Sequence, residues 1–325
     1  MANPVDAPTL ALDVADLVDW LELSALFNEF GVARLDGLRG ALKSLEESAE
    51  EDIGEDDRAS DALIEKIENE IALRSGTLGN AYPFQLGAGA EELEINKDWR
   101  EPQFSYYLIC LLTTHVSGSA ILRAPPTGEL LTRLRNRVFQ IVATLGLAGL
   151  SSGPAFSVGW PRVTGEKIVD LLERAAAAGG GFTARRPHGK YVSPAEKDGG
   201  VDVIAWTDEG TPPPTAFFFG QTASGRNWPG KPVTEHARTF GAAYMQDHMT
   251  GNLAYVTLIP YRVLDEAFWH AQHQYHMAIL DRLRLPKRAM QGAELAARGV
   301  SIDDGHSVGE LTGWVSDYYD YARAA

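Results

Sequence analysis

The chain has 325 residues, of which 45% are hydrophobic and 22% are charged, and its formal net charge is −15. These values exclude a disordered chain and a collagen-like repeat, the single cysteine excludes an intramolecular disulfide, and the negative charge argues against a protein that coats nucleic acid. The apolar stretches are too short to cross a bilayer and no secretory signal opens the chain, so we expect a cytoplasmic protein without membrane association.

The excess of negative charge lies in the first hundred residues. Residues 1–100 contain 8 Lys+Arg and 23 Asp+Glu, whereas the remaining chain contains 21 of each. Apolar residues recur at helical spacing over residues 10–30, 32–45 and 59–73, so we expect an acidic, mainly helical domain at 1–100. The acidic stretch at 46–70 is either a solvated surface or a surface that binds a basic partner or mimics DNA.

The pattern of apolar residues changes after residue 100. Helical spacing predicts helices at residues 104–115, 128–147, 164–178, 233–248 and 263–285. Short apolar runs bounded by turn residues predict strands at residues 201–206, 216–221 and 253–259. This order predicts an α/β fold with a small mixed sheet at residues 101–290, followed by a C-terminal tail at 291–325.

Polar residues stand at the ends of two predicted strands. Asp202 opens the first strand after the turn Gly199–Gly200, and Gln221 closes the second strand. If the strands are antiparallel neighbours, both side chains lie at the same edge of the sheet. Their oxygens suit a hard cation such as Mg²⁺ or Mn²⁺. The alternative is a pair of polar strand ends without a ligand.

The segment Asp-Gly-Gly-Val-Asp at 198–202, followed by a hydrophobic strand ending in Gln221, resembles the Mrr-like branch of the PD-(D/E)xK nuclease superfamily. The resemblance implies a restriction-endonuclease-like core and the activity of a metal-dependent endonuclease that cleaves DNA. It also implies that Asp202 and Gln221 are metal ligands. It also implies a carboxylate on the preceding helix, for which Glu166 is the candidate. The lysine expected two residues after the glutamine is replaced by Ala223.

Because the lysine of this family is missing, another residue would have to supply the positive charge of the site. Hydrolysis of a phosphodiester requires neutralisation of the developing charge and a positioned water. Lys197 is our candidate for this catalytic cation, with Arg226 and Lys231 as alternatives. If no cation reaches the site, the protein is instead a catalytically degenerate subunit that binds nucleic acid or a partner protein without cleavage.

A local basic stretch precedes the predicted metal strand. Arg185, Arg186 and Lys190 could contact DNA phosphates together with Arg226 and Lys231, or they could form an ordinary solubilising loop. Because an acidic chain binds DNA weakly, we also expect a protein partner, such as an activating subunit or an ATPase. The resemblance implies a role as an effector in bacterial anti-phage defence.

A second cluster of possible metal ligands is the histidine run His270, His273 and His276. Spacing of three residues could bring two imidazoles to one metal. No carboxylate completes a zinc motif, however, so we expect these residues to lie on an ordinary amphipathic helix.

Overall fold

The computed structural model describes residues 4–9, 11–48, 56–89, 91–116, 118–159, 162, 165–190, 192, 198–247 and 251–325. The chain divides into two compact units, the first comprising Met1–Leu131 with Thr312–Ala325 and the second comprising Thr132–Leu311. The expected boundary at residue 100 therefore lies about thirty residues before the structural one, and the end of the chain returns to the first unit. Across the described ranges, no helix is both long and apolar enough to span a membrane.

The first unit is mainly helical, as its sequence periodicity indicates. Its helices are α1 (Val14–Phe27), α2 (Leu35–Ser48), α3 (Asp56–Leu78), α4 (Pro102–Thr114) and most of α11 (Val308–Ala324), with a short 3₁₀ turn η1 (Gly79–Ala81). Its antiparallel sheet has the order β1 (Val32–Arg34), β3 (Glu92–Ile95), β2 (Phe84–Leu86). Asp13 caps α1 by accepting a hydrogen bond from the Asp16 N–H. Most of α1 is buried, so this helix forms the centre of the unit.

The second unit alternates helices and strands. Its helices and helical turns are α5 (Gly128–Arg133, which begins in the first unit), the π-turn η2 (Leu134–Val138), α6 (Phe139–Ser151), α7 (Ile168–Ala177), the 3₁₀ turn η3 (Trp228–Gly230), α8 (Thr234–Tyr244), α9 (Glu266–His276) and α10 (Leu285–Ala297). Its strands are β4 (Ala155–Ser157), β5 (Thr183–Ala184), β6 (Val203–Trp206), β7 (Ala216–Thr222), β8 (Met245–Gln246), β9 (Asn252–Leu258) and β10 (Ala278–Leu280).

Five of these strands form a mixed sheet in the order β10-β9-β7-β6-β4. β6 is antiparallel to both of its neighbours, β4 and β7, whereas β7, β9 and β10 are parallel to one another. The predicted α/β fold with a mixed sheet is confirmed. Because β7, β9 and β10 run in the same direction, their carboxyl ends meet at one edge of the sheet, which we call the carboxyl edge.

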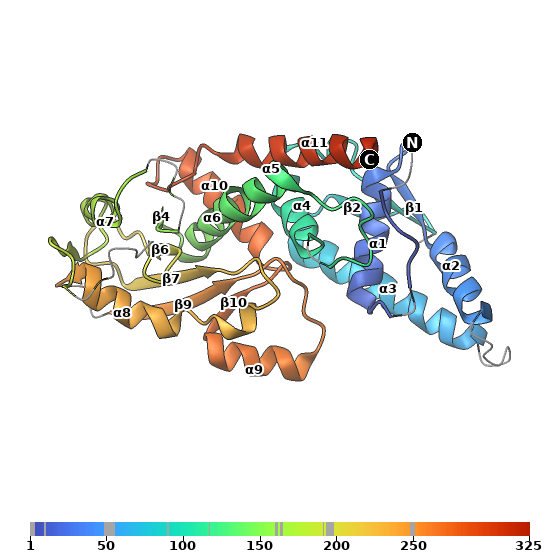
Figure 1. The fold of residues 1–325 in the computed structure, drawn as a ribbon, viewed down its shortest axis with the longest axis horizontal. Coiled ribbons are helices and arrows are strands. Elements are labelled where there is room, and N and C mark those ends of the chain that lie inside the picture. Colours follow the sequence, from blue (N-terminus) through green and yellow to red (C-terminus); the bar gives the residue numbers. More distant parts are fainter. Residues whose placement is uncertain are drawn as a thin grey trace. The chain divides into compact units, whose positions relative to one another are not determined.

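Helices cover both faces of this sheet (Figure 1). On one face α6 packs against the strands and α10 packs against α6. The two helices approach closely because a Cβ at Gly149 would overlap the Arg288 carbonyl and one at Gly292 would overlap that of Leu145. On the other face, the side chains of Trp206 and Phe219 pack against α7 and α8.

Two predictions for the C-terminal region require correction. The helix expected at 263–285 ends at His276, and β10 follows it before α10 begins. The apolar residues of β10 continue the helical pattern in the sequence, but they are buried by parallel pairing with β9. Residues 291–325, expected to be a tail, contain the end of α10 and all of α11.

Candidate functional site

The structure brings Asp202 and Gln221 together at the ends of two antiparallel strands. Val203 pairs with Gly220, so Asp202 stands opposite Gln221 one residue beyond the ladder. The Gln221 Nε2 donates a hydrogen bond of 2.6 Å to the Asp202 Oδ2, and the Thr222 N–H donates another of 2.7 Å to the same oxygen. The two residues predicted to share a cation therefore lie within direct contact.

The backbone N–H and the backbone carbonyl of Asp202 are both hydrogen-bonded. Its N–H donates to the Gly220 carbonyl at 2.9 Å. Its carbonyl accepts hydrogen bonds from the Val158 and Gly159 N–H groups, each at 2.8 Å, and from the Gln140 Nε2 at 3.0 Å. This saturation of the backbone fixes the position of the carboxyl group at the end of β6.

The turn before Asp202 explains the Asp-Gly-Gly sequence. Asp198 Oδ1 accepts the Gly200 N–H at 2.9 Å and thereby closes the turn. Gly199 and Gly200 have φ values of +64° and +76°, which side chains disfavour, and a Cβ at Gly200 would overlap the His236 ring. The Asp198–Gly200 turn therefore requires these residue types, and it places Asp202 at the start of β6.

The environment of Asp202 is unusual for a carboxylate. Burial raises its pKa to about 7; the charge of Asp198 adds to this effect, whereas the Thr222 N–H and the charge of Lys231 oppose it. The residue keeps part of its surface exposed, although the carboxyl group is largely surrounded by protein. Both hydrogen bonds that the described residues donate to this carboxyl group reach Oδ2. A carboxyl group perturbed in this way is typical of functional sites.

Lys231 is the cation that the structure associates with Asp202. Its charge acts on the Asp202 carboxyl group, and it directly follows η3 on the exposed surface. It forms no direct ion pair with Asp202 within the described residues. Arg226 instead lies 5.6 Å from the centre of the Tyr261 ring. Lys197, our sequence-based candidate, lies outside the described residues.

Glu166 has a different partner from the one predicted. Its carboxylate forms an ion pair of 3.0 Å with Arg174, which also pairs with Asp303 at 2.7 Å. Arg162 donates to the Glu166 carbonyl at 2.8 Å, and its charge interacts with both Asp198 and Glu166. The role of Glu166 as a metal ligand stays a prediction. Glu166 also precedes the helix on which it was expected, because α7 begins only at Ile168, four residues after the predicted start.

The basic stretch lines a pocket of about 700 Å³ beside α8. Arg185 donates a hydrogen bond of 2.8 Å to the Ala242 carbonyl. Arg186 forms ion pairs with Asp170 and Glu173. Lys190 is exposed at the rim. Since Arg186 is balanced by two carboxylates, this stretch carries less net positive charge than its sequence indicates.

Sequence reasoning missed the role of His276. Thr257 stands next to Gln221 in the parallel ladder of β7 and β9, and its Oγ1 lies 2.8 Å from the His276 Nδ1. The His276 Nε2 lies 3.3 Å from the Pro229 carbonyl in η3. Burial lowers the pKa of His276, so a neutral ring accepts from Thr257 and donates to Pro229. His276 thus connects β9 to the turn that precedes Lys231. The histidine run drew attention to this residue, but nothing in the sequence indicated its contact with Thr257.

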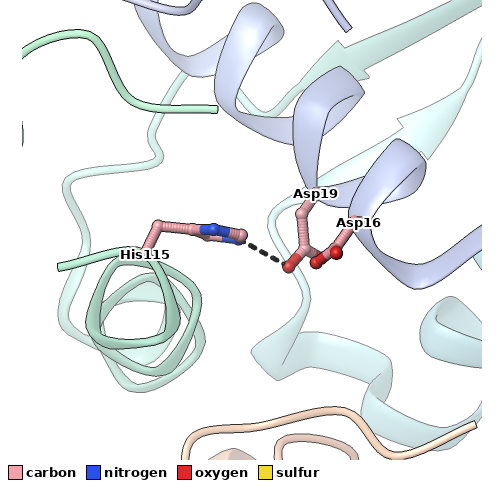
Figure 2. A group of neighbouring side chains, drawn as sticks. All are labelled: Asp16, Asp19 and His115. Carbon is pink, nitrogen blue, oxygen red and sulfur yellow. Dashed lines mark hydrogen bonds and ion pairs between the residues drawn. The ribbon is translucent and has the colours of Figure 1, made fainter. Parts of the chain in front are cut away.

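The first unit contains a group of three residues that could hold a metal ion: Asp16, Asp19 and His115. One potential ligand atom from each lies within 4.8 Å of the others. Figure 2 shows the ring of His115, the residue that follows α4, directed at Asp19 of α1, with Asp16 beside it. The His115 Nε2 and the Asp19 Oδ2 are 2.8 Å apart. None of these residues was a candidate in the sequence, because the ligands come from helices about a hundred residues apart.

Asp19 also belongs to a buried network around Arg74. The Arg74 Nη1 contacts Asp19 at 2.7 Å and Glu22 at 3.0 Å, and its Nε contacts Glu70 at 2.9 Å. Tyr107 and the backbone of the unit complete the hydrogen bonds of this guanidinium. Asp19 is therefore engaged by Arg74 and His115 without a metal.

Known proteins give no independent assignment of either group. No protein-family model, curated protein or solved structure matches the chain. The function must therefore follow from the chemistry of the residues themselves.

Proposed function

We propose that the second unit is a metal-dependent nuclease that cleaves DNA phosphodiester bonds, with Asp202 and Gln221 holding Mg²⁺ or Mn²⁺. The observation that carries this proposal is the buried Asp202 carboxyl group, which has a pKa of about 7 and contacts Gln221 at the end of the neighbouring strand. Such a carboxyl group is costly to ionise unless a cation accompanies it. Aspartate and amide oxygens are ligands that suit these two metals.

Each residue of the proposed site has a distinct task. Asp202 presents Oδ1 as the anionic ligand, because Oδ2 already accepts two hydrogen bonds. The Gln221 amide has a donor nitrogen and an acceptor oxygen. Its nitrogen donates to Asp202 in the free site, and its oxygen could bind the cation when one is present. A divalent cation at this position would polarise the phosphate and activate water. Lys231 would neutralise negative charge on the phosphate.

The arrangement also supports the resemblance to the Mrr-like branch. The lysine position of that branch is Ala223, which is buried and has no charge. The charge of Lys231, in the turn after β7, acts on Asp202 instead, so the positive charge would come from a different place in the chain. The mixed sheet, which places Asp202 and Gln221 on neighbouring strand ends, supports a restriction-endonuclease-like core.

Incubation of the purified protein with supercoiled plasmid and Mg²⁺ or Mn²⁺ tests this proposal. We expect the wild type to nick the plasmid, Asp202→Asn to abolish nicking, and Lys231→Met to reduce its rate about 100-fold. Asp208→Asn is the matched control, because Asp208 is exposed, lies just beyond the opposite end of β6, and among the described residues accepts only the Gly210 N–H. Nicking by Asp202→Asn at the wild-type rate would contradict the proposal.

A non-cleaving subunit with the same fold is the second candidate. Two observations favour it: Lys231 makes no direct ion pair with Asp202 among the described residues, and Arg186 is balanced by Asp170 and Glu173. This candidate predicts that Mn²⁺ binding depends on Asp202 while plasmid stays intact under all conditions. Calorimetric titration of Mn²⁺ into wild type and Asp202→Asn, run beside the plasmid assay, distinguishes the two functions.

The proposal includes a protein partner, as expected of an effector in anti-phage defence. The net charge of −15 opposes stable DNA binding by the isolated chain, so an activating subunit or an ATPase would supply affinity or control. Co-purification from the native host with an affinity tag tests this part. A stable partner that stimulates nicking supports it, and recovery of the chain alone, with full nicking activity, contradicts it.

A further inference from the structure

The Asp202 site opens on the face of the sheet that α7 and α8 cover. Asp202 continues the hydrogen-bond ladder one residue before β6 begins, because its N–H and its carbonyl both bond to the backbones that flank it. Alternate residues of a strand lie on one face, and Ile204 and Trp206 pack in the core that α7 and α8 form with the sheet. The same alternation links Gln221 to Phe219, which packs in that core as well. Both side chains of the site therefore project from this face.

The N-terminal end of α8 lies beside the turn that precedes Asp202. A Cβ at Gly200 would lie 2.4 Å from the His236 Cγ, so the imidazole ring packs directly on the backbone of this turn. Lys231, whose charge acts on the Asp202 carboxyl group, stands three residues before the start of α8. One short segment of the chain thus supplies both a charge that acts on Asp202 and a ring that contacts the turn before it.

Neither ring nitrogen of His236 has a partner within the part of the chain that the structure describes. The residue is exposed, and no hydrogen bond, ion pair or aromatic contact engages it there. By contrast, Glu235 accepts a hydrogen bond of 2.7 Å from the Tyr275 hydroxyl, and His276 is bonded at both ring nitrogens. Imidazole carries an N–H donor in both of its protonation states. His236 thus offers an unused donor next to the turn of the site.

We propose that His236 is a further catalytic residue of the Asp202 site, where its ring donates a hydrogen bond to the DNA phosphate group that is cleaved. The inference rests on the proposed nuclease function, because it assigns a task in that reaction to a residue outside the metal ligands. A phosphate that enters the site would meet Lys231 as a charge and His236 as a fixed donor. The ring is packed against Gly200 before the substrate arrives, which lowers the entropic cost of the contact.

The geometry separates the task of His236 from that of a metal ligand. Across the described ranges, the one group of three His, Cys, Asp or Glu side chains close enough to share an ion lies in the first unit. His236 therefore does not join Asp198 and Asp202 in a metal cluster. Its loss should weaken the contact with phosphate and leave the affinity for a cation intact. A ring that only supports the turn predicts a different result, because displacement of Gly200 would move Asp202 and weaken cation binding as well.

NMR in protein labelled with ¹³C at the histidine Cε1 tests the contact without any cleavage. The probe is a short DNA duplex, added to the Asp202→Asn protein in a buffer with EDTA. The control is His306, an exposed histidine between α10 and α11 that has no partner among the described residues. The two signals are assigned with His236→Gln and His306→Gln. We expect the duplex to shift the His236 signal and not that of His306; an unmoved His236 signal, or equal shifts of both, would overturn the inference.

Plasmid nicking and calorimetry test the role in the reaction. His236→Ala should reduce the nicking rate about 100-fold with unchanged Mn²⁺ affinity, and imidazole added to the Mg²⁺ buffer should restore part of the rate. His306→Ala should nick at the wild-type rate, and thermal unfolding verifies that each variant is folded.

Two results would count against a catalytic His236. They are nicking by His236→Ala at the wild-type rate, and a loss of Mn²⁺ affinity as large as the loss of rate. If the wild type does not nick at all, the nuclease proposal fails and the NMR contact alone decides the inference, so the two failures are distinguishable.

Discussion

Buried carboxylates occur in both units, but their partners differ. In the first unit, Asp19 and Glu22 contact Arg74 directly, at 2.7 and 3.0 Å. In the second unit, Asp202 accepts hydrogen bonds only from an amide and a backbone N–H among the described residues, and its pKa rises to about 7. A carboxylate with a buried arginine beside it has its charge compensated within the chain. Within the described residues, Asp202 has no arginine bonded to its carboxyl group, which is the property expected of a ligand for an external cation.

The largest effect should come from breaking the compensated cluster. Arg74→Met leaves Asp19, Glu22 and Glu70 buried without their cation, and we expect a loss of about 3–5 kcal/mol in the free energy of unfolding. Urea unfolding measures this loss. A change below about 1 kcal/mol would mean that the cluster is not held by Arg74 and that the contrast with Asp202 is wrong.

The opposite result is expected for Asp202→Asn. The folded-state pKa of Asp202 is raised above its unfolded value, so the contribution of this group to stability is fully present below about pH 4 and is lost as the pH rises through 7. An asparagine keeps the acceptor for Gln221 and Thr222 without a charge. We expect it to stabilise the protein by about 4 kcal/mol at pH 8, with a gain that shrinks as the pH falls towards 4. Thermal unfolding at both pH values tests this; destabilisation at pH 8 would contradict the account.

Cation affinity should follow the ionisation of the same carboxyl group. With a pKa of about 7, only about a tenth of Asp202 is ionised at pH 6 and most of it at pH 8. Because a cation must displace the proton, Mn²⁺ binding should be about tenfold weaker at pH 6 than at pH 8. Calorimetry in the two buffers measures the ratio, with Asp202→Asn as the control. Equal affinity at both pH values would exclude Asp202 as a ligand of the measured ion.

A smaller effect is expected from His276, which supports the site without touching Asp202. His276→Ala removes the link between Thr257 and Pro229, so the turn that carries Lys231 should loosen and the nicking rate should fall about tenfold. Because the charge of Lys231 lowers the pKa of Asp202, its displacement should also move the pH profile of nicking upwards. His276→Gln, which can accept from Thr257 and donate to Pro229, should restore both. A reduced rate with an unmoved pH profile would indicate a purely structural role.

The sequence was informative where local chemistry determines position. Asp198, Gly199 and Gly200 predict the turn before Asp202, and the short loop between β6 and β7 predicts the antiparallel pairing that brings Gln221 beside it. The helical spacing of the first unit likewise predicts α1, α2 and α3. In each case the relevant contacts are between residues close in the chain, or between strands joined by one turn.

Contacts between distant segments could not be predicted in this way. Asp19 and His115 are separated by 96 positions, and no local pattern indicates that their helices meet. Thr257 and His276 come together because β9 and β10 pair in parallel, whereas the sequence favoured a continuous helix through β10. The identity of the cation near Asp202 depends on where η3 directs Lys231, which is a property of the tertiary fold.

The most direct test of the central claim is to titrate the Asp202 carboxyl group and to monitor it by NMR in protein labelled with ¹³C at aspartate. The signal of Asp202 is assigned as the one that is missing from the spectrum of Asp202→Asn. The account predicts a pKa of about 7 in the free protein and a decrease of more than about one unit when Mg²⁺ or Mn²⁺ saturates the site. For the diamagnetic Mg²⁺ the shift can be read at the carboxyl carbon directly. A pKa near 4 that does not respond to either cation would contradict the account.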